Sequence, residues 1–399
     1  MLAPKVASIF VSLLPSLTQA ATLFAAQSSG DLSTLALTRS GGSYSLSVTS
    51  TTRECGGNPS WLSLDTPQRL VYCLDRGVSS ATKGSLNSFR IGEGGALSKI
   101  DSADAPFSGV AAEYFELKNG KRGYVTASYN KSAIGAFSFP SDGSVEPPAQ
   151  VLFPTNNITG PIPSRQSGSY SHHVILDPTQ KYILIPDLGA DLIRVFTYDP
   201  ETVAPLTELA PLKTDPGAGP RHGAFWKAPG RGKDKAVYLL FNGELSQKVY
   251  SYRITYKASG LVWEKVSEAY ALGELGQTLA PNTAPTSEIA VSPDQKFVIV
   301  SSRQHSFNLS PLFQKADSDS LSTFKIHDNG KLSLVQVAPS GGYLPRQFSL
   351  NKKGDKVAVG HQGNSTVVVW GRDVRSGKIG AKLGETKASG PVVFVGWDE

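Results

Sequence analysis

A strand pattern that recurs along the chain is the feature that most restricts its fold. In residues 288–336 an apolar strand (IAVS) precedes a Pro-Asp turn, a second strand (FVIVSS), a loop, a third strand (SLSTFKI), a turn and a fourth strand (KLSLVQV). The same order begins at His172 and again at Arg346, and weaker copies fill the rest of the chain. This gives about seven units of roughly 40–55 residues, the repeat length of propeller blades. We therefore expect an all-β fold, a seven-bladed β-propeller of four-stranded antiparallel blades.

Two details favour a closed ring. The second strands of the clearest units (ILIP, VIVSS, VAVG) are apolar on both faces, as expected for strands buried between neighbouring blades. The segment PVVFVGWD near the C-terminus is a lone strand beyond the last full unit. Its pairing with the first blade would close the ring and remove open sheet edges. Loops that follow the innermost strands then converge on a central channel.

The first 20 residues differ from the rest of the chain. Lys5 precedes a short apolar run over residues 6–17, and Thr18 and Ala20 place small residues at the −3 and −1 positions of a cleavage site. This pattern predicts a signal peptide over residues 1–20 and one propeller domain over 21–399; a buried first strand or helix is the alternative. No other stretch approaches the 18 apolar residues of a membrane span, so we expect a secreted, extracellular protein.

Two further features agree with secretion. Cys55 and Cys73 are close enough in the sequence to close a loop with a disulfide, although Cys73 lies in the apolar run LVYCL and two buried thiols are the alternative. Glycosylation is predicted at four Asn-x-Ser/Thr sequons, namely Asn130, Asn157, Asn308 and Asn364. The net charge of +6 is mild and its Lys and Arg residues are scattered, so no nucleic-acid partner is expected.

Several well-known catalytic signatures are missing from the sequence. It contains no GxSxG, HExxH, CxxC, P-loop or GxGxxG motif, which argues against serine hydrolases, zincins and nucleotide enzymes. The six histidines lack metal-type spacing, so neither a transition metal nor another cofactor is expected. A calcium ion in the channel stays an open alternative.

Charged residues gather where the predicted strands begin and end. Strand ends recur at the same position in successive blades, so these side chains should ring one end of the channel. Arginine binds carboxylates and polarises a developing oxyanion, and histidine moves a proton near neutral pH. The set therefore suits chemistry on a carboxylate or a lactone; the alternative is that these residues tie blades together, above all Glu288 and Arg346. The candidates are His172, His173, Arg221, His222, Glu244, Glu288, Arg303, His305 and Arg346.

Four segments carry a resemblance to a known family. They are HHVILDPTQKYILIPDLGADLIRVFTYD, GAGPRHGAFW, SEIAVSPDQKFVIVSSRQHSFNLS and LPRQFSLNKKGDKVAVGHQGNSTVVVW. They resemble the lactonase family of seven-bladed propellers, which includes bacterial-type 6-phosphogluconolactonases and fungal carboxy-cis,cis-muconate cyclases. The resemblance covers essentially the whole mature chain and is strongest from His172 onward.

The resemblance also implies roles for individual residues. In the cyclase branch a histidine, two arginines and a glutamate of the channel are the proposed active-site groups. This implies catalytic roles for the matching residues, which are His172, Arg221, Glu244 and Arg303. Candidates for substrate binding are His173, His222, His305 and Arg346. The family's blade-opening His-x-His pattern is altered here, because Tyr170 replaces its first histidine and His173 stands where a small residue is usual; this bears on the substrate.

Two functions fit these observations. The first is a secreted, monomeric enzyme that forms or opens a lactone on a small carboxylate, most like a carboxy-cis,cis-muconate cyclase. Arg221 and Arg303 would hold carboxylates, while His172 or Glu244 would move the proton, and in hydrolysis His172 would activate water. Secretion argues against a sugar-phosphate substrate. The second is a non-catalytic secreted glycoprotein, such as an adhesin or surface antigen, because a fold alone does not set function.

Overall fold

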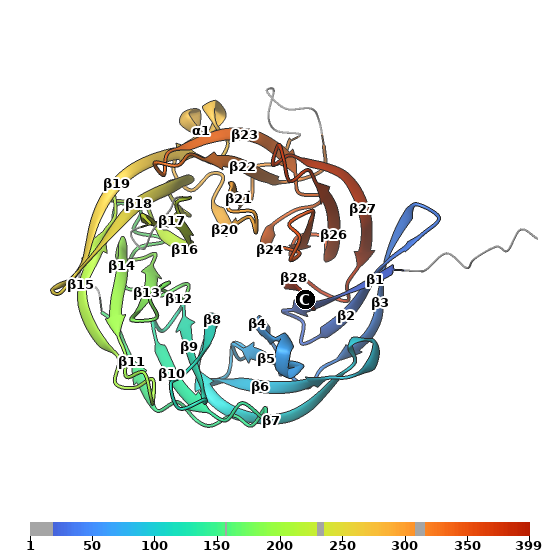
Figure 1. Cartoon of the computed structure of the whole chain (residues 1–399), viewed down its shortest axis with the longest axis horizontal. Helices are drawn as coiled ribbons and strands as arrows, with labels where there is room; N and C mark the ends of the chain where they lie inside the picture. The colour runs from blue at the N-terminus through green and yellow to red at the C-terminus, as the bar shows by residue number, and fades with distance from the viewer. Residues whose placement is uncertain (1–18, 156–157, 230–234, 308–315) are drawn as a thin grey trace, which may run out of the picture.

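The computed structural model describes residues 19–155, 158–229, 235–307 and 316–399. These residues form seven four-stranded antiparallel sheets, the blades, which are arranged radially around a central axis (Figure 1). The predicted seven-bladed propeller is therefore confirmed.

Every blade follows the same order from its innermost to its outermost strand. Blade 1 contains β28 (Val392–Trp397), β1 (Gln19–Gln27), β2 (Leu32–Ser40) and β3 (Ser43–Thr52). Blades 2 to 4 contain β4 (Pro59–Asp65), β5 (Leu70–Asp75), β6 (Lys83–Ile91) and β7 (Leu97–Pro106); β8 (Gly109–Glu116), β9 (Arg122–Ser128), β10 (Ile134–Phe139) and β11 (Gln150–Leu152); and β12 (Ile175–Leu176), β13 (Tyr182–Asp187), β14 (Leu192–Thr197) and β15 (Thr207–Lys213). Blades 5 to 7 contain β16 (Pro220–Lys227), β17 (Val237–Gly243), β18 (Lys248–Lys257) and β19 (Gly260–Tyr270); β20 (Thr286–Val291), β21 (Phe297–Ser302), β22 (Ser320–Ile326) and β23 (Leu332–Pro339); and β24 (Pro345–Leu350), β25 (Lys356–His361), β26 (Thr366–Arg372) and β27 (Ile379–Lys387).

Helices are few and short in the described part of the chain. They are the 3-10 turns η1 (Thr66–Gln68) and η2 (Glu93–Gly95) and the helix α1 (Glu274–Thr278). None of these helices has the length and apolar character that crossing a membrane would require.

The two ends of the described chain meet in blade 1. Strand β28 pairs antiparallel with β1, from Leu23 opposite Trp397 to Gln27 opposite Val392. The Ser389 hydroxyl, just before β28, contacts the Gln27 side-chain oxygen and an Asp31 carboxylate oxygen, each at 2.6 Å. This pairing is the predicted closure: it gives β1 an inner neighbour and completes blade 1 with strands from both ends of the chain.

The core lies between the blades. All six residues of β21 are buried, and five of the six residues of β13 are buried. The apolar side chains of β13 reach both neighbours: Leu184 packs in one cluster with Leu239 and Phe241 of blade 5, and Ile183 and Ile185 pack with Val125 and Ala127 of blade 3. Continuous apolar second strands therefore act as the shared core of adjacent sheets, as their sequences predict.

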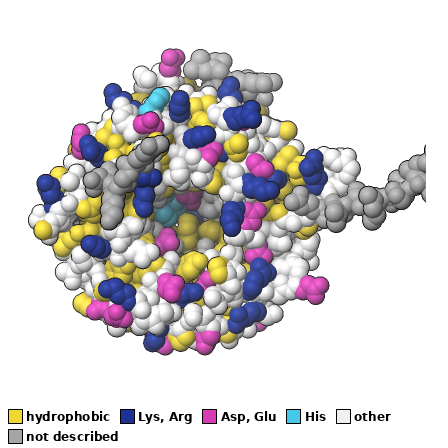
Figure 2. Space-filling view, viewed as in Figure 1, with side chains coloured by type: hydrophobic (Ala, Val, Ile, Leu, Met, Phe, Trp, Pro, Cys, Tyr) yellow, Lys and Arg dark blue, Asp and Glu magenta, His cyan; other side chains and the backbone are white. Residues whose placement is uncertain are grey.

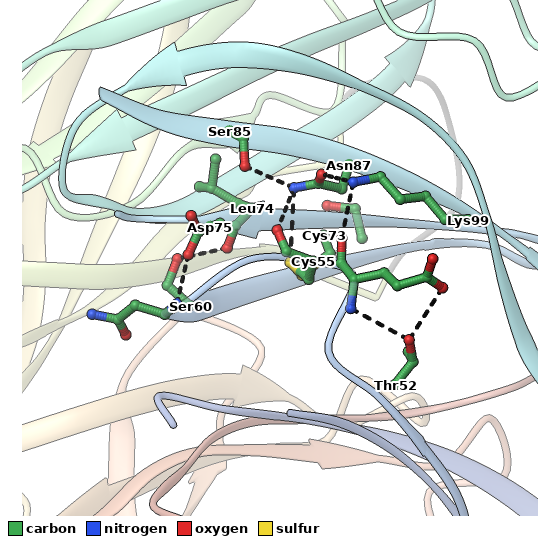
Figure 3. Close-up of a disulfide and its surroundings, with 12 residues drawn as sticks. Thr52, Cys55, Ser60, Cys73, Leu74, Asp75, Ser85, Asn87 and Lys99 are labelled. Atoms are coloured by element: carbon green, nitrogen blue, oxygen red, sulfur yellow. Dashed lines mark hydrogen bonds between the residues drawn. A yellow bond between two sulfur atoms is a disulfide. The ribbon is translucent and has the colours of Figure 1, made fainter. Parts of the chain in front are cut away.

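A disulfide anchors the chain where it passes from blade 1 to blade 2. Cys55, in the loop between β3 and β4, is bonded to Cys73 of β5 (Figure 3). The Asn87 side-chain amide donates to the Cys55 carbonyl oxygen at 2.6 Å, and the Lys99 ammonium donates to the Asn87 side-chain oxygen at 2.9 Å. The loop is thus tied to the second, third and fourth strands of blade 2.

Removing this disulfide should destabilise the protein. Closing a loop across a sequence separation of 18 restricts the unfolded chain, which is worth about 3 kcal/mol. We expect Cys55→Ala/Cys73→Ala to lower the free energy of unfolding by about that amount in urea denaturation. Reduction of the wild type should reproduce the loss and leave the double variant unchanged. A reduced wild type as stable as the oxidised protein would contradict this account.

Candidate active site

A repeated irregularity places side chains at the channel end of the innermost strands. In blades 5, 6 and 7 the pairing of the first two strands shifts register after Pro220, Thr286 and Pro345. The residues inside the shift are Arg221 and His222, Ser287 and Glu288, and Arg346. A β-bulge of this kind leaves residues out of the ladder and re-aims their side chains, which explains why charged groups occupy these positions.

A second set of site residues comes directly after the second strand of a blade. At each of these positions a backbone N–H donates to a carbonyl just before the innermost strand of the same blade, which fixes the residue at the channel mouth. The residues and their acceptors are Arg76 with Asn58, Tyr129 with Ser108, Glu244 with Gly219 and Arg303 with Pro285.

Arg221 and Arg346 of the first set and all four residues of the second set line one cavity of about 310 Å³. Figure 2 shows the ring hollowed at its centre, with histidine side chains visible inside. The lining residues of the cavity are Arg76, Val110, Tyr129, Asn130, Arg165, His172, Arg221, Glu244, Arg303 and Arg346.

Glu244 is the anion around which the cavity is organised. Its carboxylate lies 2.5 Å from Arg165 Nη2, 3.2 Å from Arg303 Nη2 and 2.7 Å from Arg221 Nε, and it is 3% exposed. Burial would raise the pKa of Glu244, but the three guanidinium groups hold this pKa at about 2. The carboxylate is therefore ionised at every physiological pH and holds three arginines in place.

The loop that presents Arg221 is itself held by blade 4. The Asp191 carboxylate accepts hydrogen bonds from the backbone N–H groups of Gly217 and Gly219, at 2.7 and 2.8 Å. Gly219 has a φ of +57° and Leu245 lies close to where a Cβ would stand, so the position suits glycine. The Arg221 guanidinium then donates to the Ser287 carbonyl of blade 6.

Positive charge exceeds negative charge at the cavity. Its lining contains five arginines and one carboxylate, Glu244. The Arg346 guanidinium makes no hydrogen bond or ion pair with any residue that the structure describes, and burial with the nearby charges of Arg221 and Arg303 lowers its pKa. An unpaired, desolvated guanidinium beside other arginines favours an anionic ligand.

Two histidines and a glutamate form a chain behind the cavity. His222 Nδ1 lies 2.9 Å from Glu288 Oε1, and His222 Nε2 lies 3.2 Å from His172 Nδ1. His172 lines the cavity, and its Nε2 has no hydrogen-bond partner among the described residues. Burial and then the charge of Arg221 lower the pKa of His172 well below 6.5. A neutral imidazole therefore presents an available nitrogen to the cavity.

Aromatic rings pack against this chain of groups. His173 stacks on His222 with ring centroids 4.2 Å apart, and Trp61 of β4 meets both rings edge-on at 5.7 Å. Tyr129 contacts the His172 ring edge-on at 5.4 Å. These contacts fix the orientation of the imidazoles, and they place His173 beside His222 and outside the cavity lining.

The structure brings together most of the predicted site residues. His172, Arg221, Glu244, Arg303 and Arg346 line the cavity. His222 and His173 lie directly behind His172. His305 is not one of the cavity-lining residues within the described ranges.

Arg346 and Glu288 differ in how they fit the interpretation that they chiefly tie blades together. Glu288 does join two blades, because it is hydrogen-bonded to His222 from the neighbouring blade. Arg346 instead lines the cavity, since the register shift leaves it outside the strand ladder.

Three site residues were missed by reasoning from sequence. Arg76 and Tyr129 occupy the same place in their blades as Glu244 and Arg303, so an alignment of the repeats by second-strand ends would have found them. Arg165 comes from the long connection between blades 3 and 4, which has no counterpart in the repeat, and no sequence signal marks it.

The predicted glycosylation sites have different settings. Asn130 is exposed and lies at the cavity, so a glycan there would stand over its mouth. Asn364 is half-buried and accepts a hydrogen bond from the Tyr343 backbone at 3.0 Å. Asn157 and Asn308 lie outside the described residues. Within those residues no group of three or more His, Cys, Asp or Glu side chains is arranged to hold a metal ion.

The fold and the site together define a seven-bladed propeller with an arginine-rich channel site. The profile of the family described as "Lactonase, 7-bladed beta-propeller" matches residues 18–396. The chain belongs to this lactonase family.

Individual relatives support the same assignment. A protein of Arthroderma benhamiae named "Probable 6-phosphogluconolactonase" is 28% identical over 346 residues, which cover 85% of this chain and 80% of the relative. The 6-phosphogluconolactonase of Bacillus subtilis is 23% identical over 325 residues, covering 81% of this chain and 82% of the relative. The structure of the periplasmic gluconolactonase of Pseudomonas aeruginosa has a TM-score of 0.74 at 24% identity, covering 95% of this chain and 99% of that one. At 24% identity, this structural likeness establishes the shared fold only.

Neutralising Glu244 should destabilise the site. Glu244→Gln leaves three buried guanidinium groups without their anion, and we expect a loss of about 3 kcal/mol at pH 7 in urea unfolding. A carboxylate with a lowered pKa contributes stability above its unfolded pKa and loses that contribution as pH falls toward the native value of about 2. The difference between variant and wild type should therefore shrink below pH 4.5.

Glu208→Gln is the matched control. Glu208 accepts a hydrogen bond from Arg194 at 2.8 Å, but its side chain is 41% exposed, so its loss should stay below about 1 kcal/mol. Equal losses in the two variants would contradict the special role of Glu244.

Proposed function

We propose that the protein is a lactone hydrolase whose substrate carries at least one anionic group. The observation that carries this proposal is the cavity itself, in which neutral His172 stands among five arginines and a single carboxylate. A neutral histidine suits removal of a proton from water, and arginines suit both an anionic substituent and a developing oxyanion.

In this proposal the chemistry needs only groups of the chain and water. A water molecule loses a proton to His172 Nε2 while its oxygen forms a bond to the lactone carbonyl carbon. Arg221 or Arg346 stabilises the oxyanion of the tetrahedral intermediate. The ring C–O bond then breaks, the proton passes to the ring oxygen, and the product is a hydroxy acid that ionises in solvent.

Glu244 takes a positioning role in this scheme. Its pKa of about 2 makes it a poor acceptor and donor of protons near neutral pH, and its oxygens already contact three arginines. The alternative that Glu244 moves the proton is therefore less favoured than His172.

The relatives and the charge support a direction and a substrate class. Relatives from Arthroderma benhamiae and Bacillus subtilis are named as 6-phosphogluconolactonases, which favours hydrolysis of a sugar lactone. Export, proposed below, argues against a phosphorylated sugar, so the anionic group of an extracellular substrate would be a carboxylate. Cyclisation of a carboxy-cis,cis-muconate is the second candidate. The arginine excess favours it as well, since such a substrate carries several carboxylates.

A substrate panel with two variants tests the proposal. The panel contains 6-phosphoglucono-δ-lactone, uncharged glucono-δ-lactone and carboxy-cis,cis-muconate, each measured above its spontaneous rate. We expect His172→Gln to lower kcat about 100-fold on the preferred substrate, because a positioned base is lost. Arg346→Gln should raise KM about 10-fold for the charged lactone, equivalent to one charge-assisted contact, and much less for the uncharged lactone.

Arg253→Gln is the control, since Arg253 is a surface residue of blade 5 with a side chain 52% exposed. It should leave kcat and KM unchanged. Turnover that is unaffected by His172→Gln would refute the proposed base. No turnover on any member of the panel would favour a non-catalytic glycoprotein.

We also propose that the protein is exported and cleaved after Ala20. The N-terminal apolar pattern supports this proposal, as does the disulfide between Cys55 and Cys73, because disulfides persist in oxidising compartments. In a secreting host, N-terminal sequencing should find Ala21 as the first residue. Deglycosylation should lower the mass of the wild type more than that of Asn130→Gln. An intact Met1 in a cytosolic fraction would contradict export.

A further inference from the structure

The chain of Glu288, His222 and His172 crosses three blades. His172 belongs to blade 4, His222 lies in the bulge of blade 5, and Glu288 lies in the bulge of blade 6. The two contacts, at 2.9 and 3.2 Å, run through opposite nitrogens of the His222 ring. This is the geometry required for a proton to enter one side of an imidazole while another leaves the opposite side.

We propose that these three groups form a proton relay that carries the proton of the attacking water from the cavity to Glu288 and back. The inference rests on the proposed lactone hydrolysis. His172 is the catalytic base that touches water, and His222 and Glu288 act through it as positioning and storage groups.

The proton balance of the relay is complete. Before reaction Glu288 is ionised and accepts from His222 Nδ1–H, His222 Nε2 accepts from His172 Nδ1–H, and His172 Nε2 is free. When His172 Nε2 takes the water proton, its Nδ1 proton moves to His222 and the His222 Nδ1 proton moves to Glu288. All three groups are then neutral. The reverse transfer returns a proton through His172 Nε2 to the ring oxygen as the C–O bond breaks.

The charge of the cavity explains why a relay is needed. An imidazolium at His172 would face the charges of Arg221 and Arg346, which lower the pKa of His172 together with its burial. A lone His172 would therefore be a weak base. Passing the proton to Glu288 neutralises a carboxylate and avoids an imidazolium at His172.

Glu288 is suited to hold a proton reversibly. It is 5% exposed, its Oε1 accepts from the backbone N–H of Ile289 at 2.9 Å, and its Oε2 is buried without a hydrogen-bond partner in the described structure. Burial raises the pKa of Glu288 to about 7. The charged or titratable groups that face it are His173, His222, Arg221 and Arg346.

Steady-state kinetics test the relay. Glu288→Gln keeps the shape of the side chain but cannot store the proton, so we expect kcat to fall about 100-fold with KM changed less than about two-fold. In the wild type, kcat should rise with pH through about 7 as Glu288 ionises, and this rise should be absent from Glu288→Gln. His222→Gln should cause a similar loss, and the double variant should be no slower than either single variant, because both break the same relay.

Glu113→Gln is the matched control. Glu113 of β8 is a half-buried glutamate of another innermost strand, with a pKa raised by desolvation to about 8, and no contact joins it to His172, His222 or Glu288 among the described residues. This variant should keep the wild-type kcat and pH profile. If Glu288→Gln keeps the wild-type kcat while the wild type is active, the relay is refuted and the proposed hydrolysis remains.

Infrared difference spectroscopy tests the relay independently of substrate turnover, because it follows the protonation of Glu288 directly. A carboxylic acid band that disappears as pH rises through about 7, is missing in Glu288→Gln, persists in Glu113→Gln and shifts in His222→Gln would support it. The relay would be overturned if the Glu288 carboxyl stays ionised down to pH 5, or if its infrared band is unchanged in the His222→Gln variant. If the spectrum supports the relay but no lactone is turned over, only the proposed hydrolysis is refuted.

Discussion

The antiparallel pairing of β28 with β1 is the interaction on which the rest of the structure depends. It joins the last strand of the chain to the first blade and turns seven radial sheets into a closed ring. Only a closed ring holds the innermost strands at fixed positions around one axis, and every group of the candidate site except Arg165 is carried at or beside an innermost strand. The hydrogen bonds of Ser389 to Gln27 and Asp31 reinforce this junction.

Given the ring, the site is organised by an imbalance of charge. Glu244 neutralises part of the arginine cluster and keeps three guanidinium groups in place, while Arg346 is left for a ligand. The same cluster lowers the pKa of His172, whereas burial raises the pKa of Glu288 although Arg221 and Arg346 act in the opposite direction. The excess of arginine therefore governs anion binding and the basicity of His172, and burial governs the basicity of Glu288.

Much of this arrangement was predictable from sequence, because equivalent residues of successive repeats occupy equivalent positions in the blades. Alternating turns and apolar second strands identified the propeller and its closure. The recurrence of strand ends brought His172, Arg221, Glu244, Arg303 and Arg346 into one ring. The repeat did not predict Arg165, because the connection that carries it has no equivalent segment in the other repeats. It also did not reach the contact between Glu288 and His222, because the pairing of side chains across blades depends on bulge geometry that the residue pattern alone does not encode.

The radial arrangement has a further consequence for how such a site can change. Six of the seven blades deliver a residue to the cavity: Arg76 from blade 2, Tyr129 from blade 3, His172 from blade 4, Arg221 from blade 5, Arg303 from blade 6 and Arg346 from blade 7. The apolar packing between blades is made largely by the second strands, so a substitution at a lining position can alter ligand preference while the hydrophobic layers stay intact. The sectors are not independent, however, because Glu244 joins Arg165, Arg221 and Arg303. A new specificity in this part of the channel therefore requires coordinated changes in several segments of the chain.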